Sequence, residues 1–174
     1  VGTGIGAGLF IEGQIYRGAT GSAGEIGHMT IDENGPLCTC GNRGCLEAMA
    51  GGKAIMAKAH EAIKLNKRTE LSDHPDPDNI TVMDVAKAAA RGDLVAQEIL
   101  AEAGNQLGIA LTSLVNLFNP NIVIVGGGVA QTGDLFLEPI RKAVLKRSLP
   151  AAVQAVRITT ARLGKRSTSM GAVV

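Results

Sequence analysis

All three cysteines of the chain lie within one eight-residue segment, in the spacing C-x-C-x4-C, and His28 precedes the first of them by ten residues. Three thiols and one imidazole form a Cys3His set, a ligand combination that closes a tetrahedral structural zinc site. Glycines on both sides of this segment allow the backbone to turn tightly enough for the cysteines to meet one ion. The sequence therefore predicts a Zn2+ site with the ligands His28, Cys38, Cys40 and Cys45.

Other interpretations of the cysteines stay open at this point. They could be small buried residues, or two of them could pair, although an odd number and the closeness of Cys38 to Cys40 disfavour a disulfide. An iron–sulfur cluster is less favoured because it usually takes four cysteines. With four protein ligands a zinc ion has no open position, so we expect a structural metal that orders a loop within residues 28–45. Such binding is worth on the order of 10 kcal/mol.

A second glycine-rich segment opens the chain, with glycines at positions 2, 4, 6 and 8 before two short apolar runs around Glu12-Gly13. The pattern predicts a β-hairpin whose first strand approaches a ligand closely. It formally matches the dinucleotide fingerprint G-x-G-x-x-A, which we reject because a strand follows where a helix is needed. Two interpretations explain the segment equally well. One is a phosphate loop of bare amides and the Thr3 hydroxyl, and the other is a hairpin with small residues for packing.

The rest of the chain predicts alternating helices and strands in one α/β domain with a mixed sheet. Expected helices are LEAMA, a segment after Gly51-Gly52, 81–91, 94–118, 134–147 and one from Met170; expected strands are 28–32, 122–125 and 155–160. Residues 66–80 and 164–169 are expected as loops, with His60 and His74 solvated. Gly104 and Gly108 predict close approach of another element to the longest helix. Gly126, Gly127 and Gly128 follow the strand 122–125, at the end where open α/β sheets bind ligands.

Composition excludes several classes of function. The net charge of +1 gives the chain no general attraction to nucleic acid or to a membrane surface. No apolar run reaches the length of a transmembrane helix, and no targeting segment is visible, so we expect a cytoplasmic protein. The chain begins inside a motif and ends on the apolar segment GAVV, so we expect a fragment of a longer protein.

The motifs together resemble one known family. GEIGH, nine further residues and then CTCGNRGCLE, with GTGIGAG before and VIVGGGV after, are similar to the ROK family of sugar kinases and related repressors, and most similar to its glucokinase branch. The resemblance covers the whole chain. It implies an actin/hexokinase-like fold with two ribonuclease-H-like lobes, in which residues 1–174 form the C-terminal lobe.

The resemblance also implies an activity: ATP-dependent phosphorylation of a hexose, with glucose to glucose 6-phosphate as the first expectation and Mg2+ as a cofactor. Two sets of residues are implied by their positions in the motifs. The sugar-binding set is Glu25, His28 and Glu47; the ATP-binding set is Thr3, Gly4, Gly6, Gly126, Gly127 and Gly128. Carboxylates suit a sugar because they accept paired hydrogen bonds from adjacent hydroxyls. Taken alone, the two glutamates would be interpreted as surface charges.

The family's catalytic aspartate belongs to its N-terminal half, so the resemblance places no catalytic base in this chain. We therefore expect the isolated 174-residue chain to lack kinase activity. The alternative function is the sugar-sensing body of a ROK repressor, which would add DNA as a partner. The intact segments GTGIGAG and GGGV favour the kinase. The resemblance also implies a homo-oligomer, with the helix 94–118 as one candidate surface, although internal packing explains its apolar residues equally well.

Overall fold

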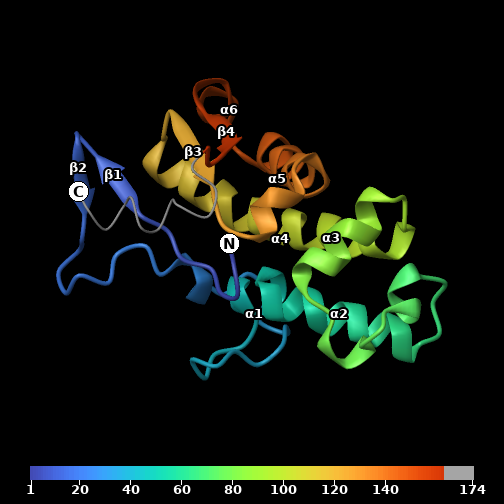
Figure 1. Ribbon diagram of the computed structural model, residues 1–174. Helices are drawn as coiled ribbons and strands as arrows, with labels where there is room; N and C mark the ends of the chain where they lie inside the picture. Colours follow the sequence, from blue (N-terminus) through green and yellow to red (C-terminus); the bar gives the residue numbers. More distant parts are fainter. Residues whose placement is uncertain (163–174) are drawn as a thin grey trace.

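The computed structural model describes residues 1–162, which contain six α-helices and four β-strands (Figure 1). The helices are α1 Leu46–Ala50, α2 Gly52–Lys64, α3 Val82–Ala90, α4 Leu94–Phe118, α5 Asp134–Arg147 and α6 Pro150–Ala155. The strands are β1 Leu9–Ile11, β2 Gln14–Tyr16, β3 Ile122–Val125 and β4 Arg157–Thr160. The single-turn 3-10 helices are η1 Ile26–His28, η2 Glu70–Asp73, η3 Pro77–Asn79 and η4 Val129–Thr132. The α/β class is as predicted.

Helix α4 is the longest element and forms the centre of the core. It begins after Asp93, whose carboxylate accepts a hydrogen bond of 2.9 Å from the Ala96 amide. It ends at Asn119, which adopts a left-handed conformation with φ 45° directly before Pro120. Apolar side chains at helical spacing between these ends are buried. The predicted span 94–118 is confirmed, and so is the cap at Asp93.

The close approach predicted at two glycines of α4 is confirmed, and the neighbouring element is α5. A Cβ added at Gly104 would lie 2.5 Å from the Phe136 carbonyl oxygen, and one at Gly108 would lie 2.5 Å from the Ala143 Cβ. The two helices therefore touch nearly backbone to backbone, and Phe136 is fully buried beside the contact. Helices α1, α2 and α3 pack around the remaining faces of α4.

The strands form two separate sheets within residues 1–162, so the prediction of one mixed sheet is wrong for this range. β1 and β2 pair antiparallel across the turn at Glu12-Gly13, as predicted, and this hairpin stands away from the helices (Figure 1). β3 and β4 pair in parallel, and the chain runs through α5 and α6 between them. A strand's own sequence does not name its partner, because long-range packing decides which strands share a sheet.

Two predicted strands differ from the structure. The segment 28–32 begins as the last residue of η1 and contains only an isolated antiparallel bridge between Thr30 and Cys45. Two backbone hydrogen bonds frame this bridge, from the Ile31 amide to the Gly44 carbonyl and from the Leu46 amide to the Met29 carbonyl, and the partner strand stops where α1 begins at Leu46. The predicted strand 155–160 is shorter, because Pro150 at the first position of α6 starts a helix that continues to Ala155.

The segment 66–80 is mostly exposed, as expected of a surface loop, but it is not wholly irregular. It contains η2 and η3, and two of its side chains are buried in the core: Leu71 within η2 and Ile80 at the end of the segment. His60 and His74 were also expected to be solvated, and both are only partly exposed. His60 Nε2 is buried with no hydrogen-bond partner within the described chain. The predicted loop 164–169 and the helix from Met170 lie outside the described residues.

None of the helices within residues 1–162 combines the length and the apolar character that crossing a membrane requires.

Candidate functional site

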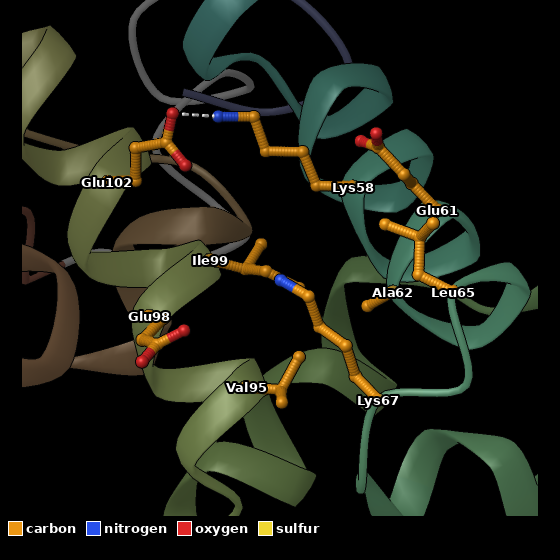
Figure 2. A pocket seen from close by; sticks show the side chains of 9 residues that line it. All are labelled: Lys58, Glu61, Ala62, Leu65, Lys67, Val95, Glu98, Ile99 and Glu102. Carbon is orange, nitrogen blue, oxygen red and sulfur yellow. Dashed lines mark ion pairs between the residues drawn. The ribbon is translucent and has the colours of Figure 1, made fainter.

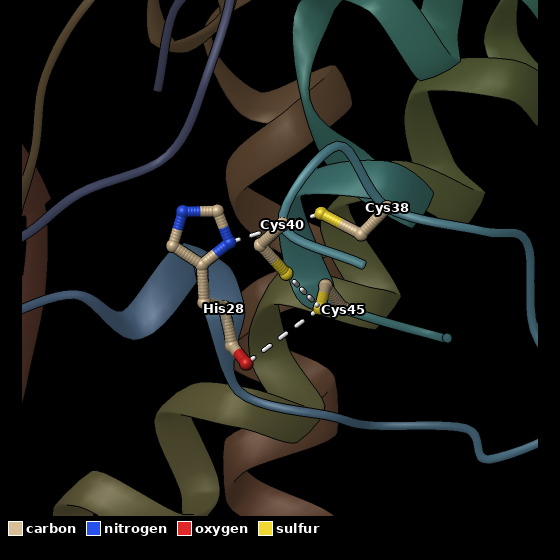
Figure 3. Close-up of side chains that lie close together, drawn as sticks. All are labelled: His28, Cys38, Cys40 and Cys45. Atoms are coloured by element: carbon tan, nitrogen blue, oxygen red, sulfur yellow. Dashed lines mark hydrogen bonds between the residues drawn. The ribbon is translucent and has the colours of Figure 1, made fainter. Parts of the chain in front are cut away.

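The four predicted metal ligands meet at one point (Figure 3). His28 comes from the end of η1, Cys38 and Cys40 from the following loop, and Cys45 from the residue that caps α1. Their candidate ligand atoms all lie within 4.8 Å of one another, although the first and last are seventeen residues apart. The three cysteines are free, which excludes the disulfide interpretation.

The distances between these atoms fit a tetrahedral ion. Cys40 Sγ and Cys45 Sγ lie 3.6 Å apart, and Cys38 Sγ lies 3.7 Å from His28 Nδ1. Zinc–sulfur bonds of about 2.3 Å in a tetrahedron place neighbouring sulfurs roughly 3.7 Å apart. The sulfur–sulfur separation matches this edge length, and a disulfide would need about 2.0 Å. The sulfur–nitrogen separation is close to the slightly shorter edge that a zinc–nitrogen bond of about 2.0 Å gives. His28, Cys38, Cys40 and Cys45 could therefore hold Zn2+ as a closed structural site.

The loop between the ligands is held by its own backbone hydrogen bonds. Cys38 donates to the Asn42 carbonyl at 2.7 Å, and Gly44 donates to the Pro36 carbonyl at 2.8 Å. Gly44 adopts φ +61°, and any Cβ there would collide with the Asp32 carbonyl oxygen. Only glycine fits this position, so the sequence C-G-N-R-G-C is required for the turn that brings the last cysteine back to the others.

Local contacts shift the pKa values of the candidate ligands in different directions. A hydrogen bond from the Cys40 amide, followed by those from neighbouring side chains, lowers the pKa of Cys38 to about 6. Burial raises the pKa of Cys45 to about 12. The hydrogen bond with Cys38 raises the pKa of His28, and the charges of Glu47 and Glu25 act in the same direction. The loop thus favours a thiolate at Cys38, which is the form that binds a metal.

Both predicted carboxylates lie near η1, whose last residue is His28. Glu25 is exposed directly before η1, and Glu47 lies in the first turn of α1, two residues after the last cysteine. Figure 3 shows that His28 turns Nδ1 toward the cysteines, while its second ring nitrogen points away from them. A Cβ added at Gly27, the residue before His28, would lie 3.4 Å from Glu47 Cβ, so Glu25, His28 and Glu47 are neighbours around η1.

The glycine-rich segment lies against this cluster. Glu47 Oε2 accepts a hydrogen bond of 2.8 Å from the Ile5 amide, and the Gly52 amide donates to the Gly2 carbonyl at 2.8 Å. Thr3 and Gly6 are exposed, and a Cβ added at Gly6 would meet no other described atom within 4 Å. Part of the predicted phosphate segment is thus open, whereas the rest contacts α1 and the start of α2.

The glycines after β3 adjoin the start of the same segment. Val129 donates to the Val1 carbonyl at 3.3 Å, and Gly127, at φ +96°, leaves no room for a Cβ beside that carbonyl. A Cβ at Gly128 would face open space as far as the described atoms extend. Gly126, Gly127 and Gly128 therefore adjoin Val1, at the start of the segment that continues to Thr3, Gly4 and Gly6.

Sequence reasoning missed two glycines that hold the site together. Gly24 has φ +94° and contacts the Ala7 carbonyl, and Ala7 in turn donates to the Gly24 carbonyl at 2.8 Å. Gly27 lies against the Ile5 carbonyl with no room for a side chain. The two glycines that flank Glu25 and Ile26 in GEIGH were the available signal, because paired glycines often mark close approach of two backbones.

A cavity of about 280 Å3 lies away from these residues, between α2 and α4 (Figure 2). Its charged groups include the ion pair of Lys58 with Glu102. Its lining residues are Lys58, Glu61, Ala62, Leu65, Lys67, Val95, Glu98, Ile99 and Glu102. None of these belongs to the predicted metal, sugar or ATP sets.

Comparison with known proteins identifies both repressors and glucokinases as relatives of this chain. The sequence model of the ROK family matches residues 1–174. The chain is 38% identical over 173 residues to a putative xylose repressor of a Caldicellulosiruptor species, covering 99% of this chain and 43% of the repressor. It is 36% identical over 173 residues to a glucokinase of Halalkalibacterium halodurans, covering 98% of this chain and 52% of the glucokinase.

Solved structures give the same result. A ROK family transcriptional regulator, a homologue of the E. coli Mlc protein, superposes with a TM-score of 0.90 at 33% identity, covering 99% of this chain and 43% of the regulator. A ROK family glucokinase from Streptomyces griseus, solved with glucose and AMPPNP, superposes with a TM-score of 0.89 at 34% identity, covering 99% and 57%. The chain thus spans about half the length of the relatives it matches.

Proposed function

This chain belongs to the ROK family, and from that premise we propose that the full-length protein phosphorylates a hexose with ATP, with glucose as the first substrate to test. Residues 1–174 would supply the sugar-binding residues and part of the ATP-binding surface as the C-terminal lobe. The catalytic base would come from the other half of the protein. The isolated chain should therefore bind ligands weakly at most and show no turnover.

The observation that carries this proposal is that Glu25 and Glu47 both adjoin the turn that ends in the metal ligand His28. Two carboxylates and the free imidazole nitrogen offer acceptors for several hydroxyl groups at fixed separations. A zinc ion held by His28 and the cysteines would contribute structure only, because all four of its positions are taken. Holding the acceptors in place before the sugar binds reduces the entropy that binding must overcome.

The ATP side of the proposal rests on the open part of the glycine segment. Thr3 and Gly6 are exposed, and the Gly128 backbone is accessible from a neighbouring loop. Backbone amides and a hydroxyl without covering side chains can approach phosphate oxygens closely. ATP supplies the phosphoryl group and Mg2+ neutralises its charge, while residues of this chain bind and orient.

The test is ADP release by the full-length protein with ATP, Mg2+ and a panel of aldohexoses. We expect turnover with at least one hexose and its loss after zinc chelation. Glu47→Gln should lower kcat/KM for the sugar on the order of 100-fold, because the amide keeps one acceptor oxygen in place of two, and the Ile5 amide already occupies one oxygen of Glu47. Glu33→Gln is the matched control, since Glu33 is an exposed glutamate of the same loop outside the site. A folded, metal-loaded protein that turns over no hexose would refute the proposal.

The second candidate function is a sugar-sensing repressor, and the 38% identity to a putative xylose repressor favours it. A repressor needs the sugar-binding residues and the metal loop, but it needs no turnover. Operator binding by the full-length protein, released by a pentose or a hexose without ATP consumption, would select this alternative. The two functions therefore give opposite results for ADP release in the presence of a bound sugar.

A further inference from the structure

One glycine of the opening segment differs from its neighbours in what lies beside it. A Cβ added at Gly2, Gly6 or Gly8 would meet no described atom within 4 Å. A Cβ added at Gly4 would collide with Glu47 Oε2 and lie 3.1 Å from Glu47 Cδ. The carboxylate thus occupies the space that any side chain at position 4 would need.

The next residue holds that carboxylate directly. The Ile5 amide donates to Glu47 Oε2 at 2.8 Å across a separation of forty-two residues, and the Ile5 side chain is 4% exposed. On its other side the Ile5 carbonyl lies against Gly27, the residue before His28. Ile5 is therefore fixed between the helix that carries Glu47 and the turn that carries the metal ligand.

We propose that Gly4 and Ile5 are positioning residues for Glu47, so that this part of the glycine segment serves the sugar site. The inference deepens the proposed function and rests on Glu47 as a sugar acceptor. Hydrogen bonds from amides to a carboxylate are stronger than those between neutral groups, and this one fixes the side-chain rotamer. With Oε2 engaged by the Ile5 amide, Oε1 is the atom directed to sugar hydroxyls.

A glycine in this segment could serve phosphate binding or the positioning of Glu47, and an added methyl group distinguishes these two roles. If Gly4 served only phosphate approach, an added methyl group would weaken ATP binding. Because its free side is filled by Glu47, the methyl group must first displace the carboxylate. Gly4→Ala should therefore weaken sugar binding and leave ATP binding nearly unchanged.

The experiment measures sugar and ATP affinity by calorimetry in the full-length protein. Gly4→Ala should raise the Kd for the hexose at least about tenfold, the loss expected for one charge-assisted hydrogen bond. The Kd for ATP should change by less than about twofold. Gly8→Ala is the matched control, because it adds the same methyl group in the same segment where space is open. The shorter side chain of Glu47→Asp withdraws the carboxylate from Gly4. Adding Gly4→Ala to Glu47→Asp should therefore change the Kd for the hexose very little further.

A second measurement keeps the inference independent of the sugar. Amide hydrogen exchange at Ile5 should accelerate at least about tenfold in Gly4→Ala and in Glu47→Ala, but not in Gly8→Ala. Absence of hexose binding by the wild-type protein would refute the proposed function, and Ile5 exchange would still decide whether Glu47 is held. Unchanged Ile5 exchange, or a weaker affinity for ATP alone in Gly4→Ala, would overturn the positioning role.

Discussion

Replacing Asp93 by alanine tests how α4 is joined to the segment before it. The Asp93 side chain is 8% exposed and accepts three hydrogen bonds. Oδ1 accepts from the Ala96 amide at 2.9 Å, which caps α4. Oδ2 accepts from the Thr69 hydroxyl at 2.7 Å and from the Glu70 amide at 2.6 Å. One carboxylate therefore joins η2 to the start of the helix on which α1 and the metal loop rest.

The expected loss of stability follows from these three contacts. Loss of the helix cap costs about 1 kcal/mol. The two other hydrogen bonds involve a charged acceptor and contribute roughly 1.5 to 3 kcal/mol each. Glu70 is exposed, so water can replace part of the lost hydrogen bonding, and the lower end of this energy range applies to both bonds. Asp93→Ala should therefore lower the free energy of unfolding by about 4 kcal/mol, which for a chain of this size lowers Tm by roughly 8 to 16 °C.

Urea denaturation of the isolated chain, followed by circular dichroism, measures this loss. Asp93→Asn retains one carbonyl oxygen and should cost about half as much, because either the cap or the η2 contacts survive. Thr69→Val breaks the same contact and also the hydrogen bond of 3.2 Å from the Leu71 amide to the Thr69 hydroxyl, so only the part of its effect that comes from the Asp93 contact should vanish in the Asp93→Ala background.

The pH dependence provides a second assay of the same residue. Burial acts to raise the pKa of Asp93, but the hydrogen bonds from Ala96, Thr69 and Glu70 outweigh it and lower the pKa below its ordinary value. A lowered pKa means that the carboxylate stabilises the fold fully above about pH 4 and that this stability is lost as pH falls through the folded-state value. Asp93→Ala should remove this acid-dependent component. A loss below 1 kcal/mol, or an unchanged acid profile, would refute the reasoning.

Three further predictions concern the metal loop and the α4–α5 contact. Gly44→Ala should reduce bound zinc, measured by mass spectrometry, to well below one ion per chain because a Cβ collides with the Asp32 carbonyl. Gly41→Ala also places a side chain at a positive φ, +93°, but its Cβ would meet no described atom, so it should retain more zinc. Chelation of the wild-type protein should lower its Tm and added zinc should restore it, whereas no change on chelation would contradict a structural metal. Gly108→Ala should cost about 1 to 3 kcal/mol in urea unfolding through overpacking against Ala143, and a neutral result would show that α5 can move away.

Local features of the fold could be predicted from the sequence. Helix α4 has the predicted bounds because its apolar spacing, its cap at Asp93 and its stop at Asn119-Pro120 all act within a few residues. The capping box of Thr81 with Asp84 is present for the same reason. Helix α6 was missed because six residues carry too little periodicity to reveal a helix. The separate sheets were missed because strand patterns do not specify partners.

The candidate site shows the same difference between local features, which the sequence predicts, and contacts between distant residues, which it does not. The metal ligands could be predicted because glycine turns bring a short segment back on itself, and the sequence spacing alone limits which atoms can meet. The role of Gly4 could not be predicted, since its neighbour Glu47 is more than forty residues away and glycine is equally suited to a phosphate or to a carboxylate. A glycine in the sequence indicates that another group can approach the backbone closely. Only the tertiary structure identifies the approaching group, and here that group belongs to the predicted sugar site.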